Sequence, residues 1–99
     1  MNLRSVRFHS DARRELRKAI NRYDQQVPGL GDEFAAEVEH YIRLIAIHPE
    51  SGSPHQVGTR RVQVRRFPYG LVYAERNEQL VVLAVAHHGR RPEYWLRRV

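Results

Sequence analysis

Cysteine is absent from this 99-residue sequence, and lysine, tryptophan and methionine each occur only once. Without cysteine the chain forms neither disulfides nor thiolate metal sites, which is compatible with a reducing compartment. The longest uninterrupted apolar run, Leu80 to Ala86, has seven residues, whereas a membrane-spanning helix needs about 20. Residues Met1 to Ser5 contain no apolar stretch of the kind found in secretory signals. These features, with a length typical of one domain, predict a single cytoplasmic domain covering residues 1–99.

Acidic residues are scarce in the second half of the chain, and this scarcity determines where the net charge of +6 lies. Residues 1–50 contain eight basic and eight acidic residues, whereas residues 51–99 contain nine arginines and three glutamates. A basic surplus confined to one half favours a polyanionic or acidic partner for that half. Sixteen of the seventeen basic residues are Arg, which binds phosphate or carboxylate through paired hydrogen bonds and keeps its proton near neutral pH. We therefore expect the second half to hold an anion rather than to transfer protons.

The first half of the chain predicts one strand followed by two helices. Leu3–Phe8 reads as a short strand, and Ser10 is the expected N-cap of the first helix. Val27-Pro28-Gly29 separates the two helices and Pro49 stops the second, so a short connection should join them as an antiparallel hairpin. Apolar residues recur three or four positions apart; they are Ala12, Leu16, Ala19, Ile20, Tyr23, Leu30, Phe34, Val38, Tyr41, Ile42 and Ile45.

The second half predicts a long loop, three strands and a tail. Residues 49–59 are loop-like in composition, and loops of this length are often functional or mobile. Arg61–Arg65 alternates strictly, Leu71–Ala74 is a second strand, and Leu80–Ala86 is apolar on both faces and therefore central. Arg90–Val99 is expected to form a short helical turn. The order β-α-α-β-β-β predicts an α+β fold in which a two-helix hairpin packs on a small, mostly antiparallel sheet.

Five short segments, spread over nearly the whole chain, form a pattern together. They are Phe8-x-x-x-Ala12-x-x-Glu15-Leu16, Pro28-Gly29-Leu30-Gly31-x-x-Phe34, Ile47-x-Pro49, the run Arg65 to Tyr73, and the ending Val85-Ala86-His87-His88-x-Arg90-Arg91-Pro92-x-Tyr94-Trp95-x-x-Arg98. In this order, in a chain of this length, they resemble the RelE/ParE toxin superfamily. The Pro-Gly-Leu-Gly junction, the Arg-Phe-Pro-Tyr segment and the His-x-x-Arg-x-Pro ending are most similar to its ParE-like, plasmid-stabilisation branch.

The resemblance implies the toxin of a type II toxin–antitoxin system. ParE-type toxins poison DNA gyrase so that cleaved DNA accumulates, which inhibits growth until a cognate antitoxin neutralises the toxin. The antitoxin's disordered, partly acidic segment is expected to fold along the helices and sheet, although the sequence assigns no contact residues to it. RelE-type toxins of the same fold instead cut messenger RNA on the ribosome, so the fold leaves open both activities and a relative that has lost activity. No cofactor motif is present in the sequence.

Seven arginines are the candidate target-binding or anion-binding residues. Some surround the predicted strand after the long loop, and the others belong to the C-terminal segment. Arg61 and Arg65 have the same strand parity and should therefore point to the same side. The plainer interpretation is a solvated face that keeps the edge of a small sheet from pairing with other chains. The seven residues are Arg60, Arg61, Arg65, Arg66, Arg90, Arg91 and Arg98.

His87, His88 and Tyr94 are the candidate catalytic residues for the ribonuclease alternative. RNA cleavage needs a base for the 2′-OH proton, an acid for the leaving oxygen and cations for the phosphorane. Lysines would serve proton transfer, but Lys18 is expected on the first helix, away from the basic half, which weakens this alternative. Adjacent strand residues face opposite ways, so the two histidines should not hold one metal ion, and no metal site is expected. The Tyr94-Trp95 pair either stacks on nucleobases or packs on the sheet.

Overall fold

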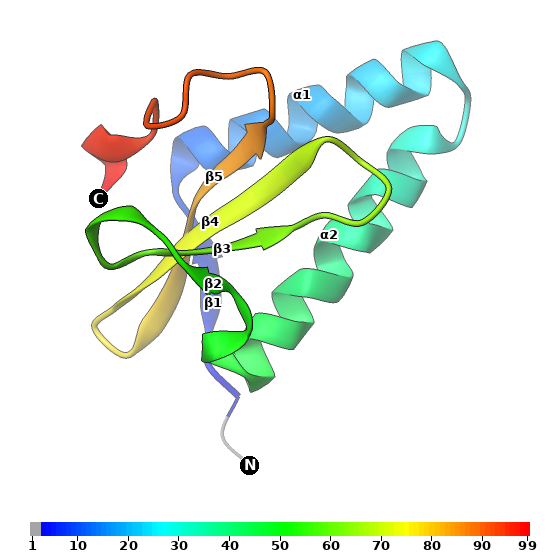
Figure 1. Cartoon of the computed structure of the whole chain (residues 1–99). Helices are drawn as coiled ribbons and strands as arrows, with labels where there is room; N and C mark the ends of the chain where they lie inside the picture. The colour runs from blue at the N-terminus through cyan, green and yellow to red at the C-terminus, as the bar shows by residue number, and fades with distance from the viewer. Residues whose placement is uncertain (1–2) are drawn as a thin grey trace.

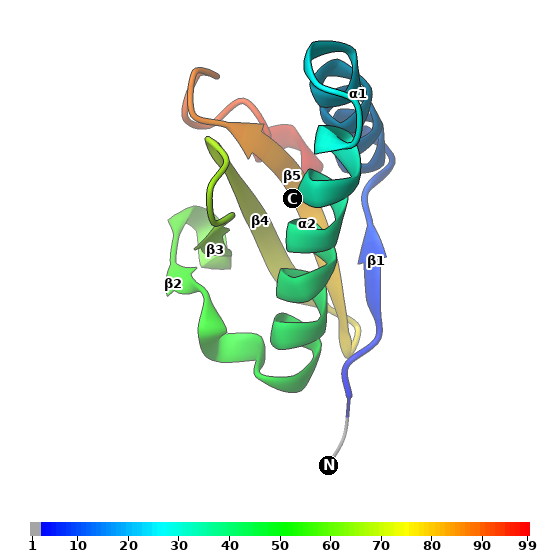
Figure 2. The same cartoon turned by 90° about the vertical axis from the view of Figure 1, so that its right-hand side faces the viewer.

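A computed structural model describes residues 3–99 of the chain. Met1 and Asn2, the start of the segment expected to carry no secretory signal, lie outside the described residues. The chain forms two layers, a hairpin of two helices and a five-stranded sheet that the hairpin covers on one face (Figures 1 and 2). The predicted α+β fold is therefore confirmed. Between residues 3 and 99, no helix combines the length and the apolar character needed to cross a membrane.

The sheet is mixed, with one parallel pair of strands among antiparallel ones. Its order is β1-β5-β4-β3-β2, and only β1 runs parallel to its neighbour, β5. The apolar strand β5 lies between β1 and β4, so its predicted inner position is confirmed. The parallel pair follows from the chain path, because the helix hairpin and then β2, β3 and β4 come between β1 and β5 in the chain, so no tight turn joins these two neighbours. The strands are β1 (Val6–Phe8), β2 (Ser53–Pro54), β3 (Arg60–Gln63), β4 (Tyr69–Arg76) and β5 (Gln79–His87).

The helix hairpin consists of α1 (Ser10–Gln26) and α2 (Leu30–Ile47), which splay apart from the turn that joins them (Figure 1). Gly29 takes a left-handed φ of 91° in this turn, a conformation that glycine adopts without a steric penalty. Gly31 lies so close to α1 that a Cβ at this position would collide with the Ile20 carbonyl oxygen. Asp24 accepts a hydrogen bond from the Gly31 N–H at 2.7 Å. The two helices are thus tied together beside the turn.

The N-cap of α1 is His9, and the prediction of Ser10 for this role was wrong. Ser10 is the first helical residue, and the His9 Nδ1 accepts a hydrogen bond from the Asp11 N–H at 3.1 Å. An imidazole nitrogen therefore satisfies an unpaired N–H of the first turn, the task that a side-chain oxygen usually performs at an N-cap.

Apolar side chains fill both faces of the sheet. The main core lies between the sheet and the hairpin, where Tyr23, Phe34, Phe67 and Tyr69 pack their rings with centroids 4.9–6.2 Å apart. A smaller cluster on the opposite face is closed by the C-terminal tail; its buried members are Val72, Ala84, Ala86 and Trp95. Since Trp95 is only 2% exposed, it packs on the sheet and is not available to stack on nucleobases.

Several predicted boundaries were wrong. The first strand begins at Val6 rather than Leu3. The strand β3 ends at Gln63 rather than Arg65, because Arg66 adopts a left-handed φ of 73° and turns the chain. The strand β4 begins at Tyr69 rather than Leu71 and ends at Arg76 rather than Ala74.

The segment 49–59 is organised rather than a free loop. It contains two short 3-10 turns, at Pro49–Ser51 and Gln56–Gly58, with β2 between them. The buried Tyr73 hydroxyl donates to the Pro49 carbonyl (2.7 Å) and accepts from the Gly52 N–H (2.9 Å). The expected loop therefore contains short 3-10 turns and a two-residue strand, and one buried phenol holds it on the sheet.

Candidate functional site

One edge of β5 is completed by side chains instead of a neighbouring strand. The strand β1 pairs with Leu80, Val81 and Val82, and the rest of β5 has no strand on that side among residues 3–99. Glu15 of α1 accepts a hydrogen bond from the Val85 N–H at 3.0 Å, and Arg98 of the tail donates to the Leu83 carbonyl at 2.9 Å.

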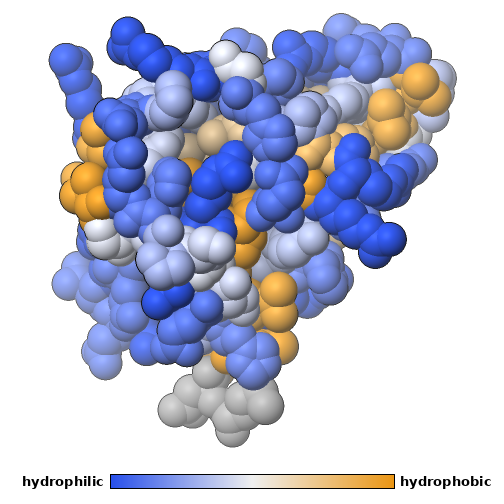
Figure 3. Space-filling model, in the orientation of Figure 1, coloured by the Kyte–Doolittle hydropathy of each residue, from blue (hydrophilic) through white to orange (hydrophobic). Residues whose placement is uncertain are grey.

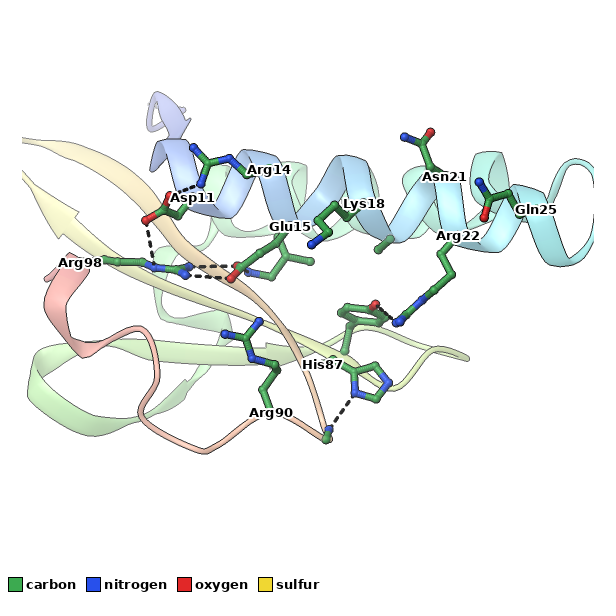
Figure 4. A pocket seen from close by; sticks show the side chains of 14 residues that line it. Asp11, Arg14, Glu15, Lys18, Asn21, Arg22, Gln25, His87, Arg90 and Arg98 are labelled. Atoms are coloured by element: carbon green, nitrogen blue, oxygen red, sulfur yellow. Dashed lines mark hydrogen bonds and ion pairs between the residues drawn. The ribbon is translucent and has the colours of Figure 1, made fainter.

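Glu15 and Arg98 also bind each other through two hydrogen bonds of 2.9 and 3.0 Å. Their side chains are only 15% and 13% exposed. This ion pair forms one end of a groove between α1 and the sheet (Figure 4).

We call this space the α1 groove; its volume is about 970 Å³. It lies between one face of α1, the start of β4, the end of β5 and the segment that follows β5. Five basic and two acidic residues line it, which leaves an excess of three positive charges. The charged residues are Asp11, Arg14, Glu15, Lys18, Arg22, Arg90 and Arg98, and the other polar or aromatic ones are Asn21, Gln25, Tyr69 and His87.

Both acidic residues of the α1 groove are neutralised by their neighbours. Glu15 is occupied by Arg98, and Asp11 accepts a hydrogen bond from Arg14 at 2.6 Å. That hydrogen bond from Arg14 lowers the pKa of the Asp11 carboxyl below its ordinary value. The excess positive charge of the groove therefore resides on Lys18, Arg22 and Arg90, which have no carboxylate partner among residues 3–99.

We call Lys18, Arg22 and Arg90 the groove cations. Two of them are held by aromatic residues: the Arg22 guanidinium donates to the Tyr69 hydroxyl at 3.2 Å, and the Arg90 guanidinium stacks 3.9 Å from the centre of the Tyr94 ring. Lys18 extends from α1 into the space between them (Figure 4). These cations come from two parts of the chain and face one cavity.

The seven arginines expected to bind an anion do not lie on one face. Arg98 belongs to the ion pair with Glu15, and Arg66 binds Glu33 at 2.7 Å. Arg60 donates to the Gly52 carbonyl at 2.8 Å, and the Arg61 guanidinium lies over Gly70. The remaining members are Arg90 in the α1 groove and the exposed residues Arg65 and Arg91.

The three candidate catalytic residues have different surroundings. His87 lines the α1 groove, where its Nδ1 accepts from the Gly89 N–H at 2.8 Å, so the neutral ring carries its proton on Nε2. The His88 Nε2 instead pairs with the Gln63 side chain at 2.8 Å. Burial raises the pKa of the Tyr94 phenol well above its ordinary value, and the nearby Glu15 adds to this effect. The Tyr94 hydroxyl therefore stays protonated at neutral pH.

The sequence reasoning missed the contribution of α1. Lys18 was expected to lie apart from the basic residues of the second half, but it shares the α1 groove with Arg90 and His87. The signal was the spacing of Arg14, Lys18 and Arg22, each four residues from the next and therefore on one helix face. The net charge of the whole first half concealed this pattern, because the acidic residues of α2 offset the three cations in that sum.

A second hollow of about 560 Å³ lies beside the N-terminal end of α1 and shares Arg14 with the α1 groove. Its lining includes Arg7, Arg13 and Arg17.

The face of the molecule seen in Figure 3 is largely hydrophilic, with smaller apolar patches between polar residues and at its edges. Among residues 3–99, no group of three or more histidine, aspartate or glutamate residues is placed to hold a metal ion.

Comparison with known proteins places the chain in a family. A family model described as the ParE toxin of type II toxin–antitoxin system, parDE, matches residues 6–92. Among solved structures, a chain described as the chromosomal ParDE TA system from P. aeruginosa is similar, with a TM-score of 0.75 and 15% sequence identity; the alignment covers 86% of this chain and 96% of that one. No curated protein sequence matches. The structural likeness concerns the fold, and the family match spans most of the sequence, so the chain belongs to the ParE toxin family of type II toxin–antitoxin systems.

Proposed function

We propose that this ParE toxin acts on DNA gyrase, binding the enzyme so that cleaved DNA accumulates. The observation that carries the proposal is the family match over residues 6–92, and the basic surplus of the chain supports it, because gyrase works on a polyanion. In this proposal the toxin acts in the cytoplasm, and a cognate antitoxin from the same parDE system neutralises it by folding an acidic segment on its surface.

The test is a supercoiling assay with purified gyrase and plasmid. We expect the chain to inhibit supercoiling and to trap cleaved plasmid, and the antitoxin to reverse both effects. Full supercoiling at a large excess of folded toxin, with no cleaved DNA, would exclude gyrase as the target.

The exposed Arg90 and Arg91 are the proposed contact residues for the target. We expect Arg90→Ala and Arg91→Ala to relieve toxicity while the domain stays folded, because exposed substitutions usually alter stability by about 0.5 kcal/mol or less. Arg43→Ala is the matched control, since Arg43 is an exposed arginine on α2 outside the groove. If both variants stay folded and as toxic as the control, the contact assignment fails even where gyrase inhibition holds.

One observation favours a second candidate, an endoribonuclease that cuts messenger RNA on the ribosome. Lys18 and His87, two side chains able to transfer protons, line the same groove as Arg90. The arginine would stabilise the charge that develops on the phosphorane. Site-specific cuts in translated messenger RNA that disappear in the His87→Gln variant would support this candidate over gyrase inhibition. Inactivity in both assays would identify a toxin that has lost its activity.

A further inference from the structure

We propose that the α1 groove is a binding site for a phosphate-bearing ligand, held by the groove cations Lys18, Arg22 and Arg90. This inference shares Arg90 with the proposed function, but it holds whether gyrase or messenger RNA is the target, because it concerns only what the groove binds. The groove face of α1 carries positive charge that no carboxylate among residues 3–99 neutralises.

The charge pattern of α1 is unfavourable for a helix on its own. Arg14, Lys18 and Arg22 are each four residues from the next, and like charges at this spacing destabilise a helix. Arg14 is compensated by Asp11 at 2.6 Å. Lys18 and Arg22 have no carboxylate partner among residues 3–99, so no ion pair offsets the repulsion between them. A bound anion would reduce this repulsion.

Both carboxylates that line the groove are already paired with arginines, which reduces their repulsion of an incoming anion. Glu15 is bound by Arg98 and by the Val85 N–H, and Asp11 is bound by Arg14. An anion that enters therefore meets the net charge of the groove cations. Binding does not require any of the existing ion pairs to break.

Two of the groove cations are oriented before a ligand arrives. Arg22 is held by the Tyr69 hydroxyl and Arg90 by the Tyr94 ring, which reduces the entropy lost when they bind. Guanidinium groups bind phosphate oxygens through paired hydrogen bonds, and the Lys18 ammonium adds a compact charge with three donors. The Nδ1 of His87 accepts from the Gly89 N–H, which leaves its Nε2 side as one more possible donor in the same groove.

This arrangement fits phosphate better than a single carboxylate. Donors that approach from α1 and from the segment after β5 surround the ligand, and a phosphate presents oxygens in several directions whereas a carboxylate presents two in one plane. A groove of about 970 Å³ accommodates a nucleotide or a short section of a nucleic-acid strand. The phosphate group is the chemistry that these two sources share.

The experiment measures fluorescence anisotropy of a short labelled DNA single strand with the purified chain, and uses unlabelled ATP as a competitor. We expect Lys18→Gln and Arg22→Gln each to weaken DNA binding by about tenfold, a loss of about 1.4 kcal/mol. Arg43→Gln removes one exposed charge on α2, and we expect it to change binding by less than about twofold, as for other exposed ion pairs. Unfolding curves of all three variants check that they are folded.

Competition by ATP would show that a free nucleotide enters the groove, and DNA binding without competition would assign the groove to a strand; either result supports the proposal. NMR shifts provide the location, and we expect them at the backbone amides of Lys18, Arg22 and Arg90. The proposal is overturned if neither probe binds, if the groove variants bind as well as Arg43→Gln, or if the shifts map to Arg65 and Arg66 instead.

Discussion

Arg98 stabilises the edge of β5, although its position in a basic C-terminal tail predicted a surface residue. Its guanidinium fills the open edge of β5 together with Glu15, and both side chains are largely buried. The sequence pattern grouped Arg98 with the surface arginines because a chain end rich in arginine gives no sign of which one turns inward. Contact with Glu15, which precedes it by 83 residues, exists only in the folded chain.

We expect Arg98→Ala to lower the free energy of unfolding by about 3–5 kcal/mol, because removing one partner leaves the Glu15 charge in a poorly solvated position. The measurement is urea-induced unfolding followed by circular dichroism. Arg43→Ala is the control: its partner Glu39 is exposed, so the loss should be about 0.5 kcal/mol or less. Equal losses in the two variants would show that the Glu15–Arg98 pair is no more than a surface contact.

Asp11 gives a prediction about pH. The hydrogen bond from Arg14 lowers its pKa in the folded chain below the ordinary value of 3.8. A carboxyl with a lowered folded pKa stabilises the fold above its ordinary pKa, and this contribution is lost as the pH falls through the folded value. We expect Arg14→Gln to raise the pKa of Asp11, as measured by NMR titration of the side-chain carboxyl. An unchanged Asp11 titration would contradict the assigned cause.

At the scale of whole elements, the close approach of α1 and α2 beside their turn depends on Gly31. Glycine to alanine inside a helix usually stabilises it by about 0.5–1 kcal/mol. At Gly31 the added methyl group would collide with the Ile20 carbonyl oxygen and the Asp24 side chain. We therefore expect Gly31→Ala to have the opposite sign and to destabilise the fold by about 1–3 kcal/mol, as measured by thermal or urea unfolding. A more stable variant would show that the two helices can move apart without cost.

The helices and the inner strand were predictable because their signals are local. Apolar residues three or four positions apart identify α1 and α2, and an unbroken apolar run identifies β5. Strand ends were less predictable: β3 stops before Arg65 because Arg66 turns the chain through a left-handed conformation. The β-bulge in β5 is also hidden from the sequence, since Val72 pairs with Ala84 and Tyr73 with Val82, leaving Leu83 unpaired.

The α1 groove could be predicted only in part. The spacing of Lys18 and Arg22 places them on one helix face, which the sequence contains. Their proximity to Arg90 depends on how α1 docks beside β5, and that docking is set by packing between residues far apart in the chain. His87 and His88 illustrate the same limit, because one lines the groove and the other pairs with Gln63.

Across the whole molecule, charge is separated by element rather than by half of the chain. The helix α2 carries half of the acidic residues of the first half of the chain, whereas α1 presents cations to the α1 groove and to the hollow beside it. A polyanion approaching the molecule is therefore attracted to the α1 side and repelled from α2. The acidic residues of α2 are Asp32, Glu33, Glu37 and Glu39.

This separation predicts how DNA binding responds to salt. Each phosphate neutralised by a cation releases counterions, and for single strands the logarithm of the binding constant falls by about 0.7 per phosphate for each unit of log salt concentration. Three groove cations should therefore give a slope of about −2, and the double variant Lys18→Gln/Arg22→Gln a slope of about −1. Anisotropy titrations at several salt concentrations measure both values, with Arg43→Gln as the control that keeps the steeper slope. Removing groove residues that contact phosphates must reduce the number of counterions released. If the double variant keeps the wild-type slope, cations elsewhere on the surface therefore hold the strand.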